Sequence, residues 1–363
     1  MTNEPELQRL IDQVQTARAV KGTLDIRGGS TKAFYGETPR GDPLDVRPLA
    51  GISSYEPSEL VVTARTGTPL AELEAALAEK GQCLPFEPPR LGDGSTVGGM
   101  VAAGLAGPAR AAVGGVRDYV LGATLLNGRG EVMSFGGQVM KNVAGYDVSR
   151  LLAGSLGILG VICEVSLKVL PVPPAVCTLR FELDQAIALK RLNEWGGQPL
   201  PLNASAWWDG MLVLRLAGAA AAVRAAVAKL GGDLIEPQLA ASFWTGLRDQ
   251  SDEFFATASQ AVARGGTLWR LSVAQTAAPL TLAGAQLVEW GGAQRWLVSD
   301  EPAAQVRAAA AAAGGHATAY RHGDVRGSVF APLAAPLARI HRELKAAFDP
   351  DRVFNPGRLY PEL

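Results

Sequence analysis

Three glycine-bearing segments in the first half of the chain combine residue types that can hold a phosphate-containing ligand. The first covers residues 27–32 and directly follows an apolar stretch; its candidate binding residues are Gly28, Gly29, Ser30, Thr31 and Lys32. Glycine tolerates positive φ and close approach, so successive backbone N–H groups can turn inward and bind an anion. The two hydroxyls add donors at the same place. The segment suits a pyrophosphate, although a strand followed by Gly-Gly-Ser is more often an ordinary turn.

The second and third segments have almost no large side chains. Residues 94–104 supply the candidates Ser95, Thr96, Gly98, Gly99, Ala102 and Gly104. Residues 154–160 and the start of the strand that follows supply Gly154, Gly157, Gly160, Val161 and Ile162. A flat ligand or a diphosphate could lie against such backbone, and tight helix–sheet packing is the alternative for each segment taken alone. Three such segments in order within one domain favour a ligand-binding framework.

Two common nucleotide-binding motifs are missing from the sequence. No P-loop Gly-Lys-Ser/Thr occurs, and no GxGxxG follows a first strand. A kinase-type NTP site and a Rossmann dinucleotide site are therefore disfavoured.

Apolar spacing and turn residues predict the elements that position these segments. We expect a helix over residues 4–20 and strands at 22–26, directly before the first segment, and at 60–65. A helix over residues 69–80 is expected to begin after Thr68 as its N-cap. Asn127-Gly128 between two apolar runs predicts a hairpin of strands 120–126 and 132–135.

A cluster of prolines, Pro171, Pro173 and Pro174, marks a predicted domain boundary. Residues 1–172 form the predicted ligand-binding domain. In residues 173–331 strand-like and helical stretches alternate, which predicts a smaller α+β domain. Residues 332–363 are expected to form a C-terminal helix and a tail that returns to the first domain.

Charge and cysteine content exclude several classes of protein. The 34 basic and 35 acidic residues of the 363-residue chain are intermixed, so nucleic acid is a poor candidate partner. No apolar run is long enough for a membrane span and no signal-peptide pattern begins the chain, so the cytoplasm is the default compartment. Cys83, Cys163 and Cys177 form no CxxC pair and cannot alone supply the four thiolates of an iron–sulfur cluster.

Four stretches of the sequence resemble the FAD domain of the vanillyl-alcohol-oxidase (PCMH-type) flavoproteins. They are Arg27-Gly28-Gly29-Ser30-Thr31, Thr96-Val97-Gly98-Gly99, Ala144-Gly145-Tyr146-Asp147 with residues 151–160, and a tail with Phe348-Asp349-Pro350 and Asn355-Pro356-Gly357. Within this family, residues 84–89, 115–122 and 137–147 are similar to the E subunits of bacterial glycolate oxidases.

The resemblance implies an α+β fold with a two-part FAD-binding domain in residues 1–172 and a smaller cap domain over the isoalloxazine. Asn355 would belong to a tail that returns to the flavin. The resemblance also implies a complex with a second FAD subunit and an iron–sulfur subunit, which oxidises glycolate, a small 2-hydroxy acid, to glyoxylate. Such a complex could lie at the inner membrane through its partners.

Two departures from the family pattern bear on the chemistry. Covalent members carry a His in the first segment where this chain has Thr31, so we expect FAD to be bound non-covalently. Related 2-hydroxy-acid dehydrogenases use a cluster of His and acidic residues to bind a metal and take the substrate proton, whereas this chain has only His316, His322 and His341, so we expect no metal. A solvated loop is the preferred interpretation of His316 and His322. Arg321 and Arg326 could pair with a substrate carboxylate, with surface charge as the alternative.

No general base is identifiable from the sequence, and this leads to a hypothesis: the flavin of this chain is an electron relay or a secondary site, and a partner oxidises the substrate. Two alternatives stay open. One is a free-standing FAD-dependent D-2-hydroxy-acid dehydrogenase of the D-lactate type. The other is a flavoprotein-derived structural subunit that has lost its cofactor, which the intact glycine segments disfavour.

Overall fold

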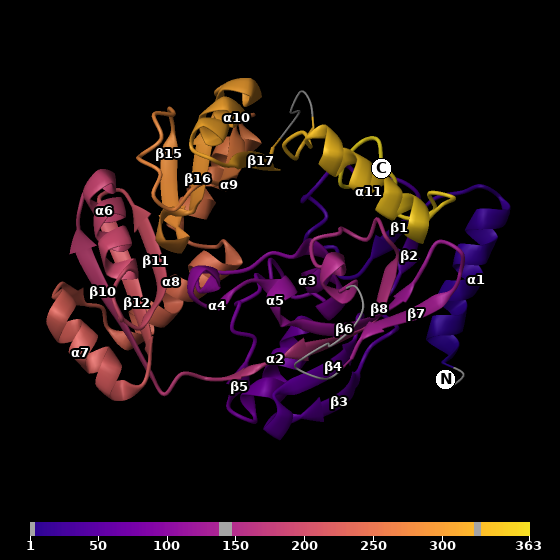
Figure 1. Cartoon of the computed structure of the whole chain (residues 1–363), viewed down its shortest axis with the longest axis horizontal. Helices are drawn as coiled ribbons and strands as arrows, with labels where there is room; N and C mark the ends of the chain where they lie inside the picture. The colour runs from indigo at the N-terminus through magenta and orange to yellow at the C-terminus, as the bar shows by residue number, and fades with distance from the viewer. Residues whose placement is uncertain (1–3, 138–146, 323–327) are drawn as a thin grey trace.

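Two β-sheets organise the chain in this computed structural model, which describes residues 4–137, 147–322 and 328–363. The first sheet has the strand order β3-β4-β8-β6-β7 and the second β13-β10-β12-β11-β15-β16-β14-β17. Neighbouring strands are antiparallel throughout both sheets. Figure 1 shows the two sheets side by side, with the short helix α4 at their junction. This architecture confirms the predicted α+β fold, whereas the boundaries at residues 172 and 331 stay a prediction.

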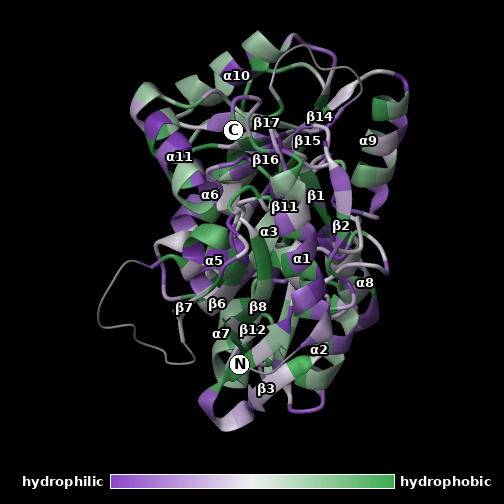
Figure 2. Cartoon of the chain, turned by 90° about the vertical axis from the view of Figure 1, so that its right-hand side faces the viewer, coloured by the Kyte–Doolittle hydropathy of each residue, from purple (hydrophilic) through white to green (hydrophobic). Residues whose placement is uncertain are grey.

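The first sheet is built by β3 (Ile52–Glu56), β4 (Val61–Arg65), β6 (Val120–Leu126), β7 (Val132–Gly136) and β8 (Val161–Lys168). The predicted hairpin at Asn127 is confirmed, because β6 and β7 pair on either side of it. The central strand β8 is buried on both faces: Val165 and Leu167 belong to a core with the helices, and Val161 and Cys163 to a second core. Figure 2 shows this concentration of hydrophobic residues in the central strands.

Helices α2 (Leu70–Ala78) and α3 (Val97–Ala103) pack on this sheet, and α1 (Pro5–Ala19) contributes to the second core. The predicted N-cap of α2 is wrong. Pro69 occupies the cap position, and the Thr68 hydroxyl donates to the carbonyl of Arg65 at 2.7 Å and accepts from the N–H of Gly51 at 2.9 Å. Thr68 therefore joins two loops instead of capping the helix.

A small parallel pair, β1 (Leu24–Arg27) with β2 (Asp42–Asp45), carries the first glycine segment at its end. The C-terminal tail comes back to this pair: Phe354 forms a parallel bridge with Leu24. The remaining short elements of this region are η1 (Pro57–Glu59), β5 (Gln82–Cys83), α4 (Arg110–Val113), α5 (Val116–Tyr119), η2 (Ser149–Leu152) and β9 (Leu170–Pro171).

The second sheet consists of β10 (Ala175–Glu182), β11 (Leu202–Trp208), β12 (Met211–Gly218), β13 (Asp233–Leu234), β14 (Thr267–Ser272), β15 (Ala285–Glu289), β16 (Gln294–Ser299) and β17 (His316–Arg321). Helices α6 (Gln185–Gly196), α7 (Ala220–Leu230), α8 (Pro237–Asp249), α9 (Glu253–Ala263) and α10 (Ala303–Ala312) accompany it, and η3 (Trp290–Gly292) links β15 to β16. The prediction of a loop around His316 is wrong, since His316 begins the edge strand β17. The low strand propensity of its alanines hides this strand.

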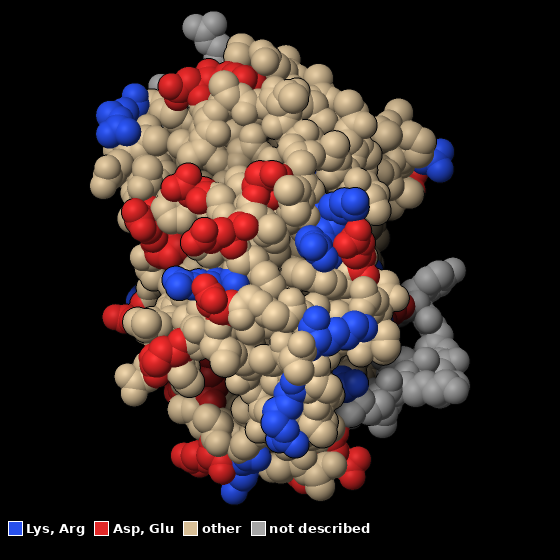
Figure 3. All heavy atoms as spheres, turned by 90° about the vertical axis from the view of Figure 1, so that its left-hand side faces the viewer, with Lys and Arg blue, Asp and Glu red and all other residues tan. Residues whose placement is uncertain are grey.

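The last helix, α11 (Ala335–Phe348), precedes the tail. In the part of the chain that the structure describes, no helix combines the length and apolarity needed to cross a membrane. On the face drawn in Figure 3, acidic and basic side chains are interspersed on a surface that is mostly uncharged.

Candidate functional site

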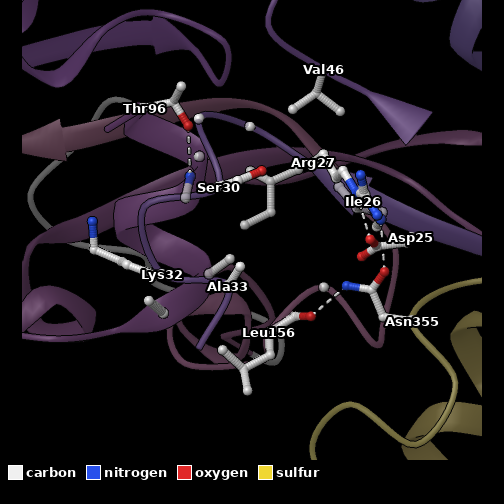
Figure 4. A pocket seen from close by; sticks show the side chains of 18 of the residues that line it. Asp25, Ile26, Arg27, Ser30, Lys32, Ala33, Val46, Thr96, Leu156 and Asn355 are labelled. Atoms are coloured by element: carbon white, nitrogen blue, oxygen red, sulfur yellow. Dashed lines mark hydrogen bonds and ion pairs between the residues drawn. The ribbon is translucent and has the colours of Figure 1, made fainter. Parts of the chain in front are cut away.

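A cavity of about 340 Å³ lies where the three glycine segments and the C-terminal tail meet (Figure 4). Thirteen of the seventeen predicted binding residues line it: Gly28, Gly29, Ser30, Thr31, Lys32, Thr96, Gly98, Gly99, Ala102, Gly157, Gly160, Ile162 and Asn355. Residues far apart in the sequence thus form one concave site.

The first glycine segment presents free backbone donors to this cavity. Ser30 adopts a left-handed backbone conformation with φ of 56°. Among the described residues, the N–H groups of Gly29, Ser30 and Thr31 donate no hydrogen bond to protein. Successive unengaged N–H groups in such a turn form an anion-binding nest. The segment is therefore arranged to hold a phosphate oxygen.

The second segment packs so tightly against the first that glycine is required at residues 28 and 29. A Cβ added at Gly29 would overlap the carbonyl oxygen of Gly94, and one at Gly28 would lie 2.5 Å from the hydroxyl oxygen of Thr96. Thr96 caps α3 by accepting from the N–H of Gly99 at 3.2 Å. These residues thus pack closely and also line the cavity.

Lys32 places a partly buried cation in the wall of the cavity. Its ammonium donates to the hydroxyl of Ser95 at 2.7 Å and to the carbonyl of Arg90 at 3.3 Å. Burial lowers the pKa of Lys32 to about 8, against the opposing charge of Asp249. Ser95 does not line the cavity itself; it holds Lys32 in place.

Asn355 clamps the tail to the first and third segments. Its side-chain oxygen accepts from the N–H of Ile26 at 2.8 Å, and its amide donates to the carbonyl of Leu156 at 2.7 Å. Gly157, with φ of 74°, must be glycine beside it, since a Cβ there would lie 2.7 Å from the Asn355 amide nitrogen. The amide of Asn355 therefore bonds to backbone, so its role in the site is to position the loops.

A buried ion pair holds the tail that carries Asn355. The Lys345 ammonium lies 2.7 Å from a carboxylate oxygen of Asp349 and 2.7 Å from each of the carbonyls of Ile158 and Phe354. Asp349 also accepts from the N–H groups of Val353 and Phe354. Both charged side chains are almost fully buried. The pair thus joins α11, the third segment and the tail.

Four predicted residues do not line the cavity: Ser95, Gly104, Gly154 and Val161. Gly104 and Gly154 face each other, because a Cβ on Gly104 would lie 2.8 Å from the Gly154 nitrogen. Val161 belongs to the second core. Asp147 is exposed and paired with Arg150, and Tyr146 and Arg326 lie outside the described residues.

Sequence reasoning missed ten lining residues: Asp25, Ile26, Arg27, Ala33, Pro39, Val46, Thr66, Ala103, Leu156 and Arg358. Thr66 matters most, because its hydroxyl is buried and has no hydrogen-bond partner. Arg358 donates to the carbonyls of Ala33 and Glu37, which shapes the first segment from behind. Position alone could have suggested four of them: Arg27, Ala103 and Leu156 lie inside the three glycine segments, and Ala33 directly follows the first.

The lining fits the chemical parts of FAD. The nest at residues 29–31 and the Lys32 ammonium suit a diphosphate. Ala102, Leu156 and Ile162 offer apolar surface to a ring system, and the orphaned Thr66 hydroxyl offers it a hydrogen bond. The described residues include no group of three or more His, Cys, Asp or Glu side chains arranged to hold a metal ion.

Comparison with known proteins agrees with this geometry. Residues 4–136 match the model of the FAD binding domain family. The chain is 49% identical over 356 residues to glycolate oxidase subunit GlcE of Escherichia coli K12, covering 98% of each protein. The chain belongs to the GlcE family. FAD is therefore its cofactor, and it is an FAD-dependent oxidoreductase of a family related to 2-hydroxy-acid enzymes, as predicted.

More distant similarities are partial or concern the fold alone. Mitochondrial D-lactate dehydrogenase (cytochrome) of Arabidopsis thaliana is 32% identical over 171 residues, 44% of this chain and 30% of that protein. Glycolate oxidase subunit GlcD of Bacillus subtilis is 32% identical over 155 residues, 42% of this chain and 33% of that one. A solved alkyldihydroxyacetonephosphate synthase superimposes with a TM-score of 0.66 at 15% identity, covering 96% of this chain and 74% of that one.

Proposed function

We propose that this chain is the FAD-binding subunit of a complex that oxidises glycolate to glyoxylate and passes the electrons through the flavin to partner subunits. The observation that carries the proposal is the similarity to a glycolate oxidase subunit along 98% of both chains. The cavity supports it, since the residues that fit FAD line one site. FAD, when bound, supplies the two-electron acceptor.

The residues of the chain bind and orient this cofactor. The nest at residues 29–31 and Lys32 would hold the diphosphate, and the second and third segments would lie against the rings. Gly104, Gly154 and Val161 would support the lining residues without contacting FAD, as Ser95 supports Lys32. Binding would be non-covalent, because no His, Cys or Tyr side chain lines the cavity within the described residues. Asn355 and the Lys345–Asp349 pair would keep the site closed at the tail.

The partners proposed are a second FAD subunit and an iron–sulfur subunit. The partial similarity to a GlcD subunit supports the first of these. The domain division also belongs to the proposal: the FAD-binding domain in residues 1–172, the cap in 173–331 and the returning tail in 332–363. The two sheets, β3 to β8 and β10 to β17, fall on either side of the first boundary. The complex would be held at the inner membrane through its partners.

The test is purification of the tagged chain from native cells, followed by three measurements on the product. We expect co-purifying subunits, a flavin spectrum that acid precipitation releases into the supernatant, and bleaching of that spectrum by glycolate. Flavin retained in the acid pellet would contradict non-covalent binding. A colourless preparation would favour the structural-subunit alternative. Faster bleaching by D-lactate than by glycolate, from a chain without partners, would favour the D-lactate-type dehydrogenase.

A further inference from the structure

A second, smaller cavity lies where the segment 105–108 meets the eight-stranded sheet. Its volume is about 20 Å³, enough for one ordered water molecule. Polar side chains of the sheet and of the end of α8 form one side: Arg270, Glu289, Gln294, Tyr320 and Gln250. Figure 1 shows this junction beside α4, where the first part of the chain approaches β16 and α8.

Four adjacent strands converge on this cavity. Arg270 lies on β14 opposite Trp296 of β16, and Glu289 at the end of β15 pairs with Gln294 at the start of β16. The register between β14 and β17 shifts at Tyr320, which leaves this residue without a partner opposite it. Such a bulge re-aims a side chain, and bulges are frequent beside active sites.

Glu289 is a buried acid with one oxygen engaged. Its Oε2 accepts from the indole N–H of Trp296 at 2.6 Å and from the amide of Gln294 at 2.9 Å, and Gln294 in turn accepts from Arg270 Nε at 2.7 Å. No described residue donates to its Oε1. Burial raises the pKa of Glu289 to about 7, in spite of the two hydrogen bonds.

Charged and titratable groups surround Glu289 on several elements. Asp252, at the start of α9, raises its pKa further and Arg270 lowers it. Tyr320 on β17 and Arg248 on α8 line the same cavity. Arg248 is already paired with Asp249, whereas Arg270 forms no ion pair with any described carboxylate. Arg270 is therefore the cation of this cavity that is available to a ligand.

Two further atoms of the wall lack partners. The side-chain oxygen of Gln250 is buried and accepts no hydrogen bond. Its amide donates to the Tyr320 hydroxyl at 2.8 Å, and no described residue accepts the hydrogen of that hydroxyl. A buried polar atom without a partner is costly, so the cavity is built to contact a polar ligand or water.

The second cavity lies next to the FAD cavity. Ala103 lines the FAD cavity and Leu105, two residues on, lines the second one. The Tyr320 ring packs on Phe34 and Tyr35 at centroid distances of 5.3 and 5.5 Å, and these residues directly follow Ala33 of the FAD cavity. A ligand in the second cavity would thus lie beside the cofactor.

We propose that this second cavity is the binding site of the small 2-hydroxy acid, with Arg270 and Tyr320 donating to its carboxylate and Glu289 accepting its hydroxyl proton. The proposal rests on the proposed function, since it requires FAD in the neighbouring cavity. A ligand of five heavy atoms exceeds the present volume, so entry requires the Gln250 side chain, held by one hydrogen bond, to turn aside.

Glu289 and bound FAD together account for the proton and the two electrons that the 2-hydroxy acid loses on oxidation. The O–H bond breaks and its proton passes to the ionised Glu289. The C–H bond would break with loss of its electron pair, for which bound FAD would supply the two-electron acceptor, and a carbonyl would form in place of the alcohol. The chain would therefore carry a substrate-oxidising site of its own, in contrast to the hypothesis that its flavin only relays electrons.

The test uses the intact flavin-loaded complex and oxalate, a two-carbon dianion that cannot be oxidised in this way. Calorimetry should show oxalate binding that Arg270→Gln weakens roughly ten- to a hundredfold, as expected for lost charge-assisted hydrogen bonds. Arg270→Lys should keep part of the affinity, and Arg224→Gln, at an exposed position of α7, should keep all of it. Should Arg270→Gln lose its flavin, Tyr320→Phe provides the same comparison by removing only a hydroxyl.

The proton role is tested by kinetics. Glu289→Gln should retain flavin and oxalate binding but lose glycolate turnover by roughly 10²- to 10⁴-fold, together with the rise of kcat/KM through about pH 7. Glu182→Gln, at an exposed position of β10, is the matched control. Unchanged oxalate affinity in the Arg270 and Tyr320 variants, or unchanged turnover in Glu289→Gln, would overturn the proposal. A wild-type complex without flavin would instead refute the proposed function, and its absorbance spectrum distinguishes the two failures.

Discussion

Replacing Lys345 by Met tests whether the buried ion pair holds the C-terminal tail on the flavin site. The substitution removes three contacts of 2.7 Å, to Asp349 and to the carbonyls of Ile158 and Phe354. It leaves the Asp349 carboxylate fully buried with only backbone N–H partners. Breaking a buried pair by removing one partner costs about 3–5 kcal/mol, because an uncompensated charge remains. We expect a loss of stability of that size.

We expect the substitution to loosen the C-terminal tail as well as to lower the free energy of unfolding. The tail carries Asn355, whose amide joins Ile26 to Leu156, so a loosened tail should also lower flavin retention. The assay is urea unfolding followed by flavin release, with the flavin-to-protein ratio measured before denaturation. Arg339→Met, which breaks the exposed pair with Glu343, is the control and should leave both quantities close to wild type.

A double variant separates the charge from the packing. Lys345→Met with Asp349→Asn removes the uncompensated carboxylate. The double variant should therefore lose clearly less unfolding free energy than the two single variants lose together. The reasoning fails if Lys345→Met unfolds at the wild-type urea concentration and keeps its flavin. It also fails if the double variant loses the full sum, because the two side chains would then act independently.

Three further predictions concern the lining of the cavity. Thr66→Val removes the orphaned hydroxyl at nearly constant volume and should weaken FAD binding to the apoprotein by roughly tenfold, whereas Thr66→Ser should not. Equal FAD affinities of wild type and Thr66→Val in a fluorescence titration would exclude this contact. Gly29→Ala should abolish flavin loading because its Cβ overlaps the Gly94 carbonyl, while Gly137→Ala, with open space around it, should load normally. FAD affinity should fall as pH rises through about 8, since Lys32 loses its positive charge there, and Lys32→Met should bind weakly without that pH dependence.

The parts of the fold and site that were predictable depend on local chemistry. The hairpin at Asn127 follows from turn residues that act on their immediate neighbours, whereas the positive φ expected at Gly28 or Gly29 occurs at Ser30 instead. The grouping of the three glycine segments was also foreseen, from their order and from the family resemblance. These features need no knowledge of which distant residue packs against which.

The features that were missed depend on tertiary contacts. Thr66 is an ordinary strand-end residue in the sequence, and only its burial beside Gly98 makes its hydroxyl an orphan. Lys345 stands in a helix of otherwise exposed charges, and its role depends in part on the carbonyl of Ile158, 187 residues away in the chain. Glu289 differs from a surface acid only through the strands that enclose it. Apolar spacing carries no signal for these three.

The same contacts that shape the cavity couple cofactor binding to the stability of the chain. Gly29 touches Gly94, and Asn355 joins the first strand to the third segment, so the lining forms only when distant parts of the chain are in place. A ligand that binds only this assembled state stabilises it by RT ln(1 + [L]/Kd), about 2.7 kcal/mol at a hundredfold excess over Kd. Removing FAD should therefore lower the unfolding midpoint of the wild type, and the shift should shrink in Lys345→Met, where the tail already fails to close the site. An equal shift in both proteins would show that the tail and the cofactor site are independent.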